Sequence, residues 1–179
     1  MLRQMSGAVA LTLVATGVNA QTYATGDSRS ISTPTYPTVC ETLSAQFSTS
    51  ARSSPPSSDD TSRIQAALKS CAGTGKSVVL AASGSNNAFY SGQLSVDGEG
   101  LVVNSGVTLE GNNSYSSESE LIEVTGTNAF IGGQGAIDGR GDIISGTPRL
   151  VQTSNADNFI AYQITLQQAA HPHLYIQGG

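Results

Sequence analysis

The fold is decided by two passes of one pattern, Leu121-Ile-Glu-Val-Thr-Gly-Thr-Asn-Ala-Phe-Ile-Gly-Gly-Gln-Gly-Ala-Ile-Asp-Gly139 and Leu150-Val-Gln-Thr-Ser-Asn-Ala-Asp-Asn-Phe-Ile-Ala-Tyr-Gln-Ile-Thr-Leu166. With one offset, the alignment places four apolar pairs together: Leu121 with Leu150, Phe130 with Phe159, Ile131 with Ile160, and Ile137 with Leu166. Further repeats of the pattern lie on both sides. His173-Leu-Tyr-Ile176 starts a later repeat, and Leu101 to Leu109 is an earlier one, with Leu109 in the place of Ile131. Val78-Val-Leu80 is a candidate for the first repeat. A period of roughly 20 to 30 residues is typical of repeat architectures.

Each repeat contains short β-branched runs that are broken by Gly, Asn and Asp. This composition favours strands joined by tight turns over helices. One cluster of strands cannot bury its apolar face alone, but stacked coils can, because each coil pairs with its neighbours. The sequence therefore predicts an all-β fold, a right-handed parallel β-helix with three strands per coil and inward columns of Val, Ile, Leu and Phe. A leucine-rich repeat has a similar period, but its helical arc needs a longer stretch than these repeats contain.

The composition points to a single secreted domain. The chain has 179 residues, a net charge of −5, only 12% charged residues and no Trp. A charge-poor, hydroxyl-rich chain is typical of secreted all-β proteins and argues against a helical bundle or coiled coil. The acidic balance makes nucleic acid an unfavourable partner. A polyanionic ligand would need locally placed Lys or Arg side chains.

Residues 1–20 have the pattern of a secretory signal, with Arg3, an apolar core over 8–14 and the small-residue site Val18-Asn-Ala20. The alternatives are a disordered tail or a lipid anchor. The apolar run is too short to span a bilayer, and no other segment could cross one. Residues 21–37 are polar and are expected to form an extended arm, because Pro34 and Pro37 limit any helix. The expected domain is residues 38–179, outside the cell.

Residues 59–71 carry the signals of a helix: Asp59 or Asp60 as N-cap, an apolar face, and Gly73 beyond its end. We expect this helix to cap the N-terminal end of the stack, where the first coil would otherwise expose unpaired backbone groups. Cys40 and Cys71 are the two cysteines of the chain. In an oxidising compartment such a pair most simply forms one disulfide. Two free buried thiols are the alternative, and a catalytic cysteine is least favoured because neither has a nearby His.

Several polar residues are candidates for a functional site. Asp138 and Asp142 could form a carboxylate pair, but the Asp-Gly dipeptide also explains a turn out of a strand. The tripeptide Arg140-Gly-Asp142 occurs in adhesion proteins and recurs by chance. His173 is a candidate substrate contact or a structural residue, and a metal site is disfavoured because no Cys, Asp or Glu stands near. Asn112-Asn-Ser114 is a glycosylation sequon in a polar stretch that suits an exposed loop, although chance explains it almost as well.

Five motifs in the same order resemble glycoside hydrolase family 28, the polygalacturonases and their relatives. The resemblance runs from about Pro37 to the end of the chain. The motifs are Asp59-Asp-Thr-Ser-Arg-Ile-Gln-Ala-Ala-Leu-Lys-Ser-Cys71, Asn87-Ala-Phe-Tyr-Ser-Gly-Gln-Leu94, Ser105-Gly-Val-Thr-Leu109, Gly135-Ala-Ile-Asp-Gly-Arg-Gly141, and Ile164-Thr-Leu-Gln167 followed by Pro172-His-Leu174. In the second motif Gln93 replaces the Pro of the family pattern.

The resemblance implies a parallel β-helix, secretion, and hydrolysis of the α-1,4-linked galacturonan of pectin with inversion. Inversion needs a general acid and a general base far enough apart to admit a water. The implied partner is the pectin polysaccharide, with no cofactor, no metal, no membrane, and a monomeric full-length protein.

In the family the catalytic motifs N-x-D, D-D, G-H-G and R-x-K follow the I-T-L strand in that order, and none of them occurs after Ile164-Thr-Leu166 in this chain. No catalytic residue can therefore be carried over. We expect the chain to be an N-terminal portion of about four coils, open at its C-terminal side, inactive by itself and prone to associate. The alternative function is a non-catalytic carbohydrate-binding or adhesion module, with His173, Tyr175 and Arg149 as contacts. A pectate lyase would need a Ca²⁺ site of several carboxylates, and the repeats show none.

Overall fold

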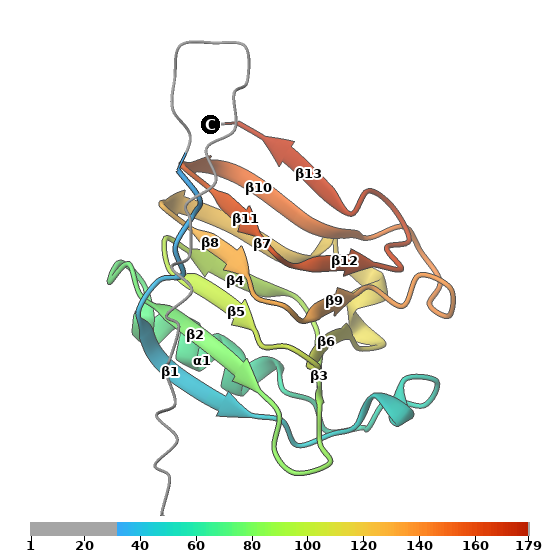
Figure 1. The fold of residues 1–179 in the computed structure, drawn as a ribbon. Coiled ribbons are helices and arrows are strands. Elements are labelled where there is room, and N and C mark those ends of the chain that lie inside the picture. Colours follow the sequence, from blue (N-terminus) through green and yellow to red (C-terminus); the bar gives the residue numbers. More distant parts are fainter. Residues whose placement is uncertain (1–31, 179) are drawn as a thin grey trace, which may run out of the picture. The chain divides into compact units, whose positions relative to one another are not determined.

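A computed structural model of the chain describes residues 32–178 (Figure 1). The expected secretory signal, 1–20, and most of the expected arm, 21–37, lie outside the described residues. The strands and the α-helix belong to a compact unit that begins at Thr35. Within it, the strands form three parallel sheets, named here A, B and C, of five, four and four strands.

The three sheets contain the following strands in spatial order. Sheet A consists of β1 (Val39–Ser44), β2 (Ser77–Ala81), β5 (Gly100–Val103), β8 (Phe130–Gly132) and β11 (Ile160–Tyr162). Sheet B consists of β3 (Ala88–Ser91), β6 (Thr108–Gly111), β9 (Ala136–Asp138) and β12 (Thr165–Gln167). Sheet C consists of β4 (Leu94–Asp97), β7 (Glu120–Thr127), β10 (Arg149–Asp157) and β13 (Leu174–Gln177). Two short 3₁₀ helices lie at Thr49–Ala51 and Ser114–Ser117.

The chain visits sheets A, B and C in turn, so each coil contributes one strand to each sheet. The first coil is β2-β3-β4 and the last is β11-β12-β13, and in Figure 1 the coils stack from green to red. Every strand pair is parallel, which gives each inner strand backbone partners in the coils before and after it. This architecture is the parallel β-helix that the repeats predict.

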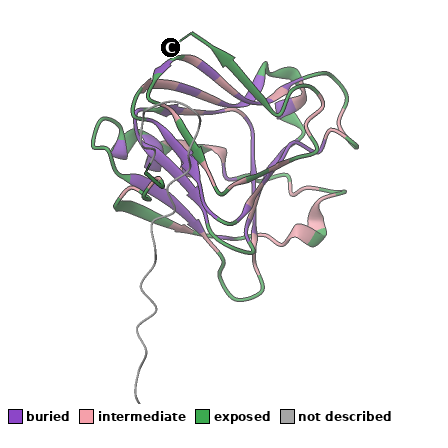
Figure 2. Ribbon diagram, turned by 45° about the horizontal axis from the view of Figure 1, so that its top comes forward, coloured by how far each residue is buried: buried purple, intermediate pink, exposed green. Residues whose placement is uncertain are grey.

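The core lies inside the coils, where side chains of equal register form apolar columns. Figure 2 marks the buried residues along these strands in purple. In sheet B, Phe89, Leu109, Ile137 and Leu166 follow one another from β3 to β12. Sheet C has an equivalent column from Leu94 through Ile122 and Val151 to Leu174. Burying an aliphatic side chain stabilises the fold by roughly 1.5–3 kcal/mol, so the columns supply most of the driving force.

The helix α1 (Thr61–Cys71) covers the N-terminal end of the stack, and its buried face consists of Ile64, Ala67, Leu68 and Cys71. This face packs against β1, β2 and β4. The N-cap position is Asp60, but the oxygen that accepts from the Thr61 amide belongs to Asp59, at 3.0 Å.

Asp60 instead holds the helix to the first coil. Its buried carboxylate accepts from the Tyr90 amide at 2.9 Å and from Arg63 at 2.6 Å. Burial raises the pKa of this carboxyl, and Arg63 partly offsets the rise. At the other end of α1, Cys71 forms the expected disulfide with Cys40 of β1, across a sequence separation of 31 residues.

The expected register is wrong in sheet A. Phe130 pairs with Ile160 and not with Phe159, because β10 contains one extra residue between Thr153 and Ala156. Asn155 lies in this bulge with a positive φ of 52°, which Asn tolerates better than most residues. The turn that follows β11 is one residue shorter than the turn after β8, and the expected pairing of Ile137 with Leu166 is therefore confirmed.

The expected placement of Leu109 in the position of Ile131 is also wrong. Leu109 pairs with Ile137, and Leu101 pairs with Ile131. The register shift also places Phe130 and Phe159 in different environments. Phe130 faces the outside of sheet A, in a small apolar cluster with Val79 and Val102. Phe159 packs against the interior core. A shift of one residue moves a side chain to the opposite face of a strand, so the two positions are not equivalent.

Candidate functional site

Polar side chains form a column on the outer face of sheet B. Tyr90 of β3, Glu110 of β6, Asp138 of β9 and Gln167 of β12 occupy equal register positions on successive coils. Outward positions alternate with the inward positions of the core column, because successive side chains of a strand point to opposite faces. The sequence thus places two carboxyl groups on adjacent coils of one face.

The segment that contains the first 3₁₀ helix lies over this column. The Tyr90 hydroxyl donates to the Ser48 carbonyl at 3.1 Å, and the Thr49 amide donates to Asn87 at 3.1 Å. The rings of Phe47 and Tyr90 meet edge to face, with centroids 5.8 Å apart. These contacts place Arg52, the residue directly after the 3₁₀ helix, over the column.

Arg52 binds both carboxylates that the sequence singled out. Its Nε and Nη2 donate to Asp138 at 3.1 and 3.0 Å, and its Nη1 and Nη2 donate to Asp142 at 3.0 and 2.6 Å. These bonds raise the pKa of Arg52 and lower the pKa of Asp142. Asp138 also accepts from the Arg140 amide at 2.7 Å, as an Asp in a turn does, and from Gln167 at 2.9 Å. The turn role of Asp138 is confirmed, and the pair is bound as an ion-paired cluster.

The Arg140-Gly141-Asp142 tripeptide is not presented to solvent as an adhesion motif would require. Arg140 is 1% exposed. Its Nη1 donates to the Gly111 carbonyl at 3.0 Å and to Asn113 at 3.2 Å. The guanidinium group therefore ties the turn after β9 to the coil before it.

Glu110 is the site residue that the sequence reasoning missed. It is 0% exposed, and neither of its carboxylate oxygens has a hydrogen-bond partner among residues 32–178. Burial is the main cause that raises its pKa to about 7, and the charge of Asp138 adds to the rise, while Arg52 and Arg140 oppose it. Glu110, Asp138 and Arg52 line a polar pocket of about 280 Å³. The sequence could have revealed Glu110 through its position in the repeat, because Thr-Leu-Glu110 aligns with Ala-Ile-Asp138.

Glu110 should make the protein more stable in mildly acidic than in neutral solution. The ordinary pKa of its carboxyl is 4.5, and the folded value is about 7. Between these values the folded chain holds a proton that the unfolded chain has lost, so the free energy of unfolding falls as the pH rises. The shift corresponds to a loss on the order of 3 kcal/mol.

We therefore expect Glu110→Gln to be more stable than the natural protein at pH 8, and to differ little from it at pH 4.5. Urea unfolding across this pH range measures the effect. The exposed Glu118, changed to Gln, is the matched control, and its curve should follow the natural protein. A Glu110→Gln curve parallel to that of the natural protein would show that the carboxyl stays ionised in the fold.

A second polar surface lies on the outer face of sheet C. The Arg149 guanidinium lies 4.4 Å from the ring centroid of Tyr175, and its Nη1 donates to Gln152 at 2.6 Å. Tyr175 is 38% exposed and stands beside Gln152 in the register of β10 and β13. The structure thus brings together two of the three contacts that the sequence named. His173 lies in the exposed segment directly before β13, and its carbonyl accepts from the Val151 amide at 3.1 Å.

The expected exposed loop at Asn112 is wrong. Asn112 is 6% exposed, and its amide nitrogen donates to Asp59. Its amide oxygen accepts from Ser114 and from the Tyr115 amide. The side chain links the cap to the second coil and is buried in the folded protein.

Residues 32–178 contain no group of three or more His, Cys, Asp or Glu side chains arranged to hold a metal ion. The same residues include no helix with the length and apolar character of a membrane span.

Comparison with known proteins gives two kinds of relative. The endo-polygalacturonases of Pectobacterium carotovorum subsp. carotovorum and Pectobacterium parmentieri are each 43% identical over 95 residues, which is 52% of this chain and 21% of theirs. The solved polygalacturonase from Erwinia carotovora ssp. carotovora superposes with a TM-score of 0.62 and 32% identity, over 77% of this chain and 44% of that one. No protein-family model matches the chain.

The chain therefore spans about a fifth of the length of these curated relatives. The identity and the shared coil architecture agree with the order of motifs in the sequence. Over the residues that match, this chain is related to the polygalacturonases, which agrees with the resemblance of its motifs to glycoside hydrolase family 28.

Proposed function

We propose that this chain belongs to a pectin-degrading glycoside hydrolase, and that its coils hold the galacturonan chain and do not cleave it. The observation that carries the proposal is the 43% identity to endo-polygalacturonases over 95 residues. Galacturonan is a polyanion, whereas the chain has a net charge of −5. Binding therefore needs a local cation on an accessible face.

Arg149 fits this requirement better than the other described arginines. Arg52 and Arg63 are bound to Asp carboxylates, and Arg140 is buried. Arg149 forms no such ion pair within residues 32–178, and it stacks on the exposed ring of Tyr175. A guanidinium group can bind a sugar carboxylate through two parallel hydrogen bonds. An aromatic ring beside it offers an apolar surface to the C–H face of a sugar.

The carboxyl groups around Asp138 on sheet B support binding without cleavage. Inverting hydrolysis needs two carboxyl groups that flank the scissile bond and leave room for a water. Asp138 and Asp142 are both occupied by Arg52, and the Asp138 side chain is only 3% exposed. Glu110 is buried beneath the same segment.

Binding and cleavage can be measured on the purified chain with polygalacturonate and short oligogalacturonides. We expect binding in titration calorimetry, and no release of reducing ends above that of the buffer. Arg149→Ala should weaken binding about tenfold, because it removes a charge-assisted hydrogen bond. Arg149→Lys should recover part of the loss, since it keeps the charge without the planar fork.

The control is Lys76→Ala, which removes one positive charge from an exposed turn and should leave the affinity within about twofold in moderate salt. Equal losses in the Arg149 and Lys76 variants would mean general electrostatics instead of a site on sheet C. Reducing ends released by the chain alone would overturn the binding-only role.

A carbohydrate-binding module without chemistry is the second candidate, and the neutralised Asp138–Asp142 pair favours it. Antibodies against residues 32–178 can isolate the protein from its native source. Cleavage of polygalacturonate by the isolated protein supports the hydrolase. Binding without cleavage in the same preparation supports the module.

A further inference from the structure

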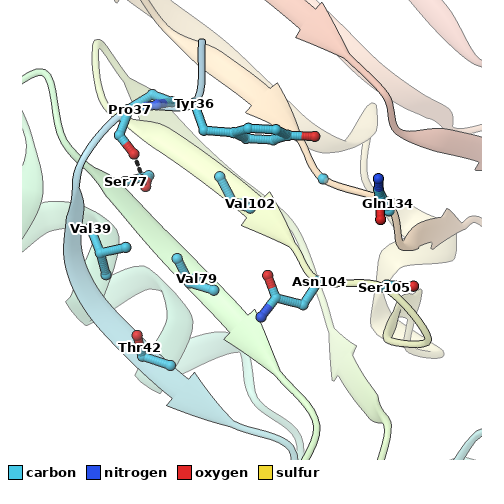
Figure 3. Close-up of a pocket in the computed structure, with 11 residues that line it drawn as sticks. Tyr36, Pro37, Val39, Thr42, Ser77, Val79, Val102, Asn104, Ser105 and Gln134 are labelled. Carbon is cyan, nitrogen blue, oxygen red and sulfur yellow. Dashed lines mark hydrogen bonds between the residues drawn. The ribbon is translucent and has the colours of Figure 1, made fainter. Parts of the chain in front are cut away.

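A hollow of about 500 Å³ lies on the outer face of sheet A (Figure 3). Its floor is formed by Val79 of β2 and Val102 of β5, which are register partners. The segment Tyr36-Pro37 and strand β1 stand along one side, and the turns after β5 and β8 stand along the other. The volume falls within the usual range of small-molecule sites, about 300–1,000 Å³.

The floor is apolar where a solenoid surface is normally polar. Val79 and Val102 point away from the core, yet they are only 8% and 7% exposed. They form a separate apolar cluster with Phe130, against which Tyr162 packs. The two valines thus provide an apolar base outside the main core.

Tyr36 forms a fixed aromatic wall above this floor. Its ring lies 5.6 Å from Phe130 in an edge-to-face arrangement and 5.8 Å from Tyr162. Its hydroxyl donates to Gln163 at 2.6 Å. The residue nevertheless remains 41% exposed. An aromatic ring that is already held in place loses little conformational freedom when a ligand stacks on it.

The rim supplies neutral hydrogen-bonding groups. Asn104 and Gln134 contribute amides, and Thr42 contributes a hydroxyl. Figure 3 shows Asn104 extending toward Val79 from the end of β5. Neither amide side chain makes a hydrogen bond to another residue within 32–178, so both can bind a ligand. None of the lining residues is Asp, Glu, Lys or Arg.

We propose that this hollow binds an uncharged saccharide of one or two rings, at a site separate from the Arg149–Tyr175 face. A sugar ring has an apolar C–H face that suits Tyr36 and the valine floor, and hydroxyl groups that suit the amide rim. A uronate is excluded because its carboxylate would lose water without gaining a cation. A purely apolar ligand is disfavoured because it would leave the two amides without partners.

The test compares lactose, cellobiose and maltose with digalacturonate, using chemical-shift changes of the whole purified chain. We expect at least one neutral disaccharide to bind with a Kd in the millimolar range. Tyr36→Ala should weaken this binding roughly tenfold, since stacked rings and buried apolar area are lost together. Tyr36→Phe keeps the ring and should weaken it much less. Asn104→Ala should weaken it by roughly fivefold.

Arg149→Ala is the control that separates this site from the galacturonan site, and it should not change the affinity for the neutral sugar. Loss of neutral-sugar binding in Arg149→Ala, but not in Tyr36→Ala, would place that sugar on sheet C and overturn the proposal. The proposal is also overturned if none of the three disaccharides binds, or if only digalacturonate does. Indole serves as an apolar probe, and binding of indole alone at Tyr36 would assign the hollow to apolar ligands instead.

Discussion

Cys40→Ser is expected to lower the free energy of unfolding by roughly 3–4 kcal/mol, because the natural disulfide closes a loop across 31 residues. The cross-link joins β1, an edge strand of sheet A, to the end of the capping helix. Without it, β1 keeps its pairing with β2 and its packing against α1. We expect β1 and α1 to open before the inner coils, which urea unfolding and amide hydrogen exchange can measure separately.

Cys40 is the informative position because its side chain is exposed, whereas Cys71 is 0% exposed. Changing Cys71 would add the cost of a cavity under the helix to the loss of the cross-link. Ser44→Ala on the same strand is the control and should shift stability by no more than about 0.5 kcal/mol. If Cys40→Ser under reducing conditions behaves like this control, the cap is held by packing alone.

Arg52→Ala is expected to destabilise the fold by about 2–3 kcal/mol. Its guanidinium is the cation that neutralises Asp138, whose side chain is 3% exposed. Leaving a buried charge without its partner costs about 3–5 kcal/mol in a fully buried pair. The loss should be smaller here, because Gln167 and the Arg140 amide still donate to Asp138. The contact with Asp142 adds little, since that carboxylate is 45% exposed.

A double-mutant cycle tests the origin of this loss. Asp138→Asn removes the buried charge, so Arg52→Ala should cost much less in that background than in the natural one. Lys76→Ala, at an exposed position, is the matched loss of positive charge and should be nearly neutral. Equal costs of Arg52→Ala in both backgrounds would show that Arg52 acts through packing of the segment around Thr49–Ala51. Limited proteolysis of that segment gives an independent measure of its release.

The expectations that rested on local pattern were confirmed where no insertion intervenes. The helix lies at Thr61–Cys71, inside the expected range 59–71, because capping signals and the apolar face are properties of adjacent residues. The pairings of Leu121 with Leu150 and of Ile137 with Leu166 follow from the apolar spacing of the two repeats. The expected pairing of Phe130 with Phe159 is wrong, because the bulge at Asn155 shifts the register from Ala156 to the end of β11.

The candidate sites could be predicted less well from the local sequence pattern. Asp138 and Asp142 were visible as a pair, but their partner Arg52 precedes them by 86 and 90 residues. Asn112 lies in a polar stretch, yet its amide is buried against Asp59, which is 53 residues away. Arg149 and Tyr175 were named together and do meet, because they lie on adjacent strands of sheet C.

From its sequence alone, this protein can be seen to stack coils and to place aliphatic residues in inward columns, because a periodic pattern in a solenoid maps directly onto repeated pairing. Only the tertiary structure decided which side chains on the outer faces are covered. A short segment before α1 brings Arg52 onto Asp138 and buries Glu110, and Tyr36 closes over Phe130 and Tyr162. These contacts join residues far apart in the chain, so no local spacing records them.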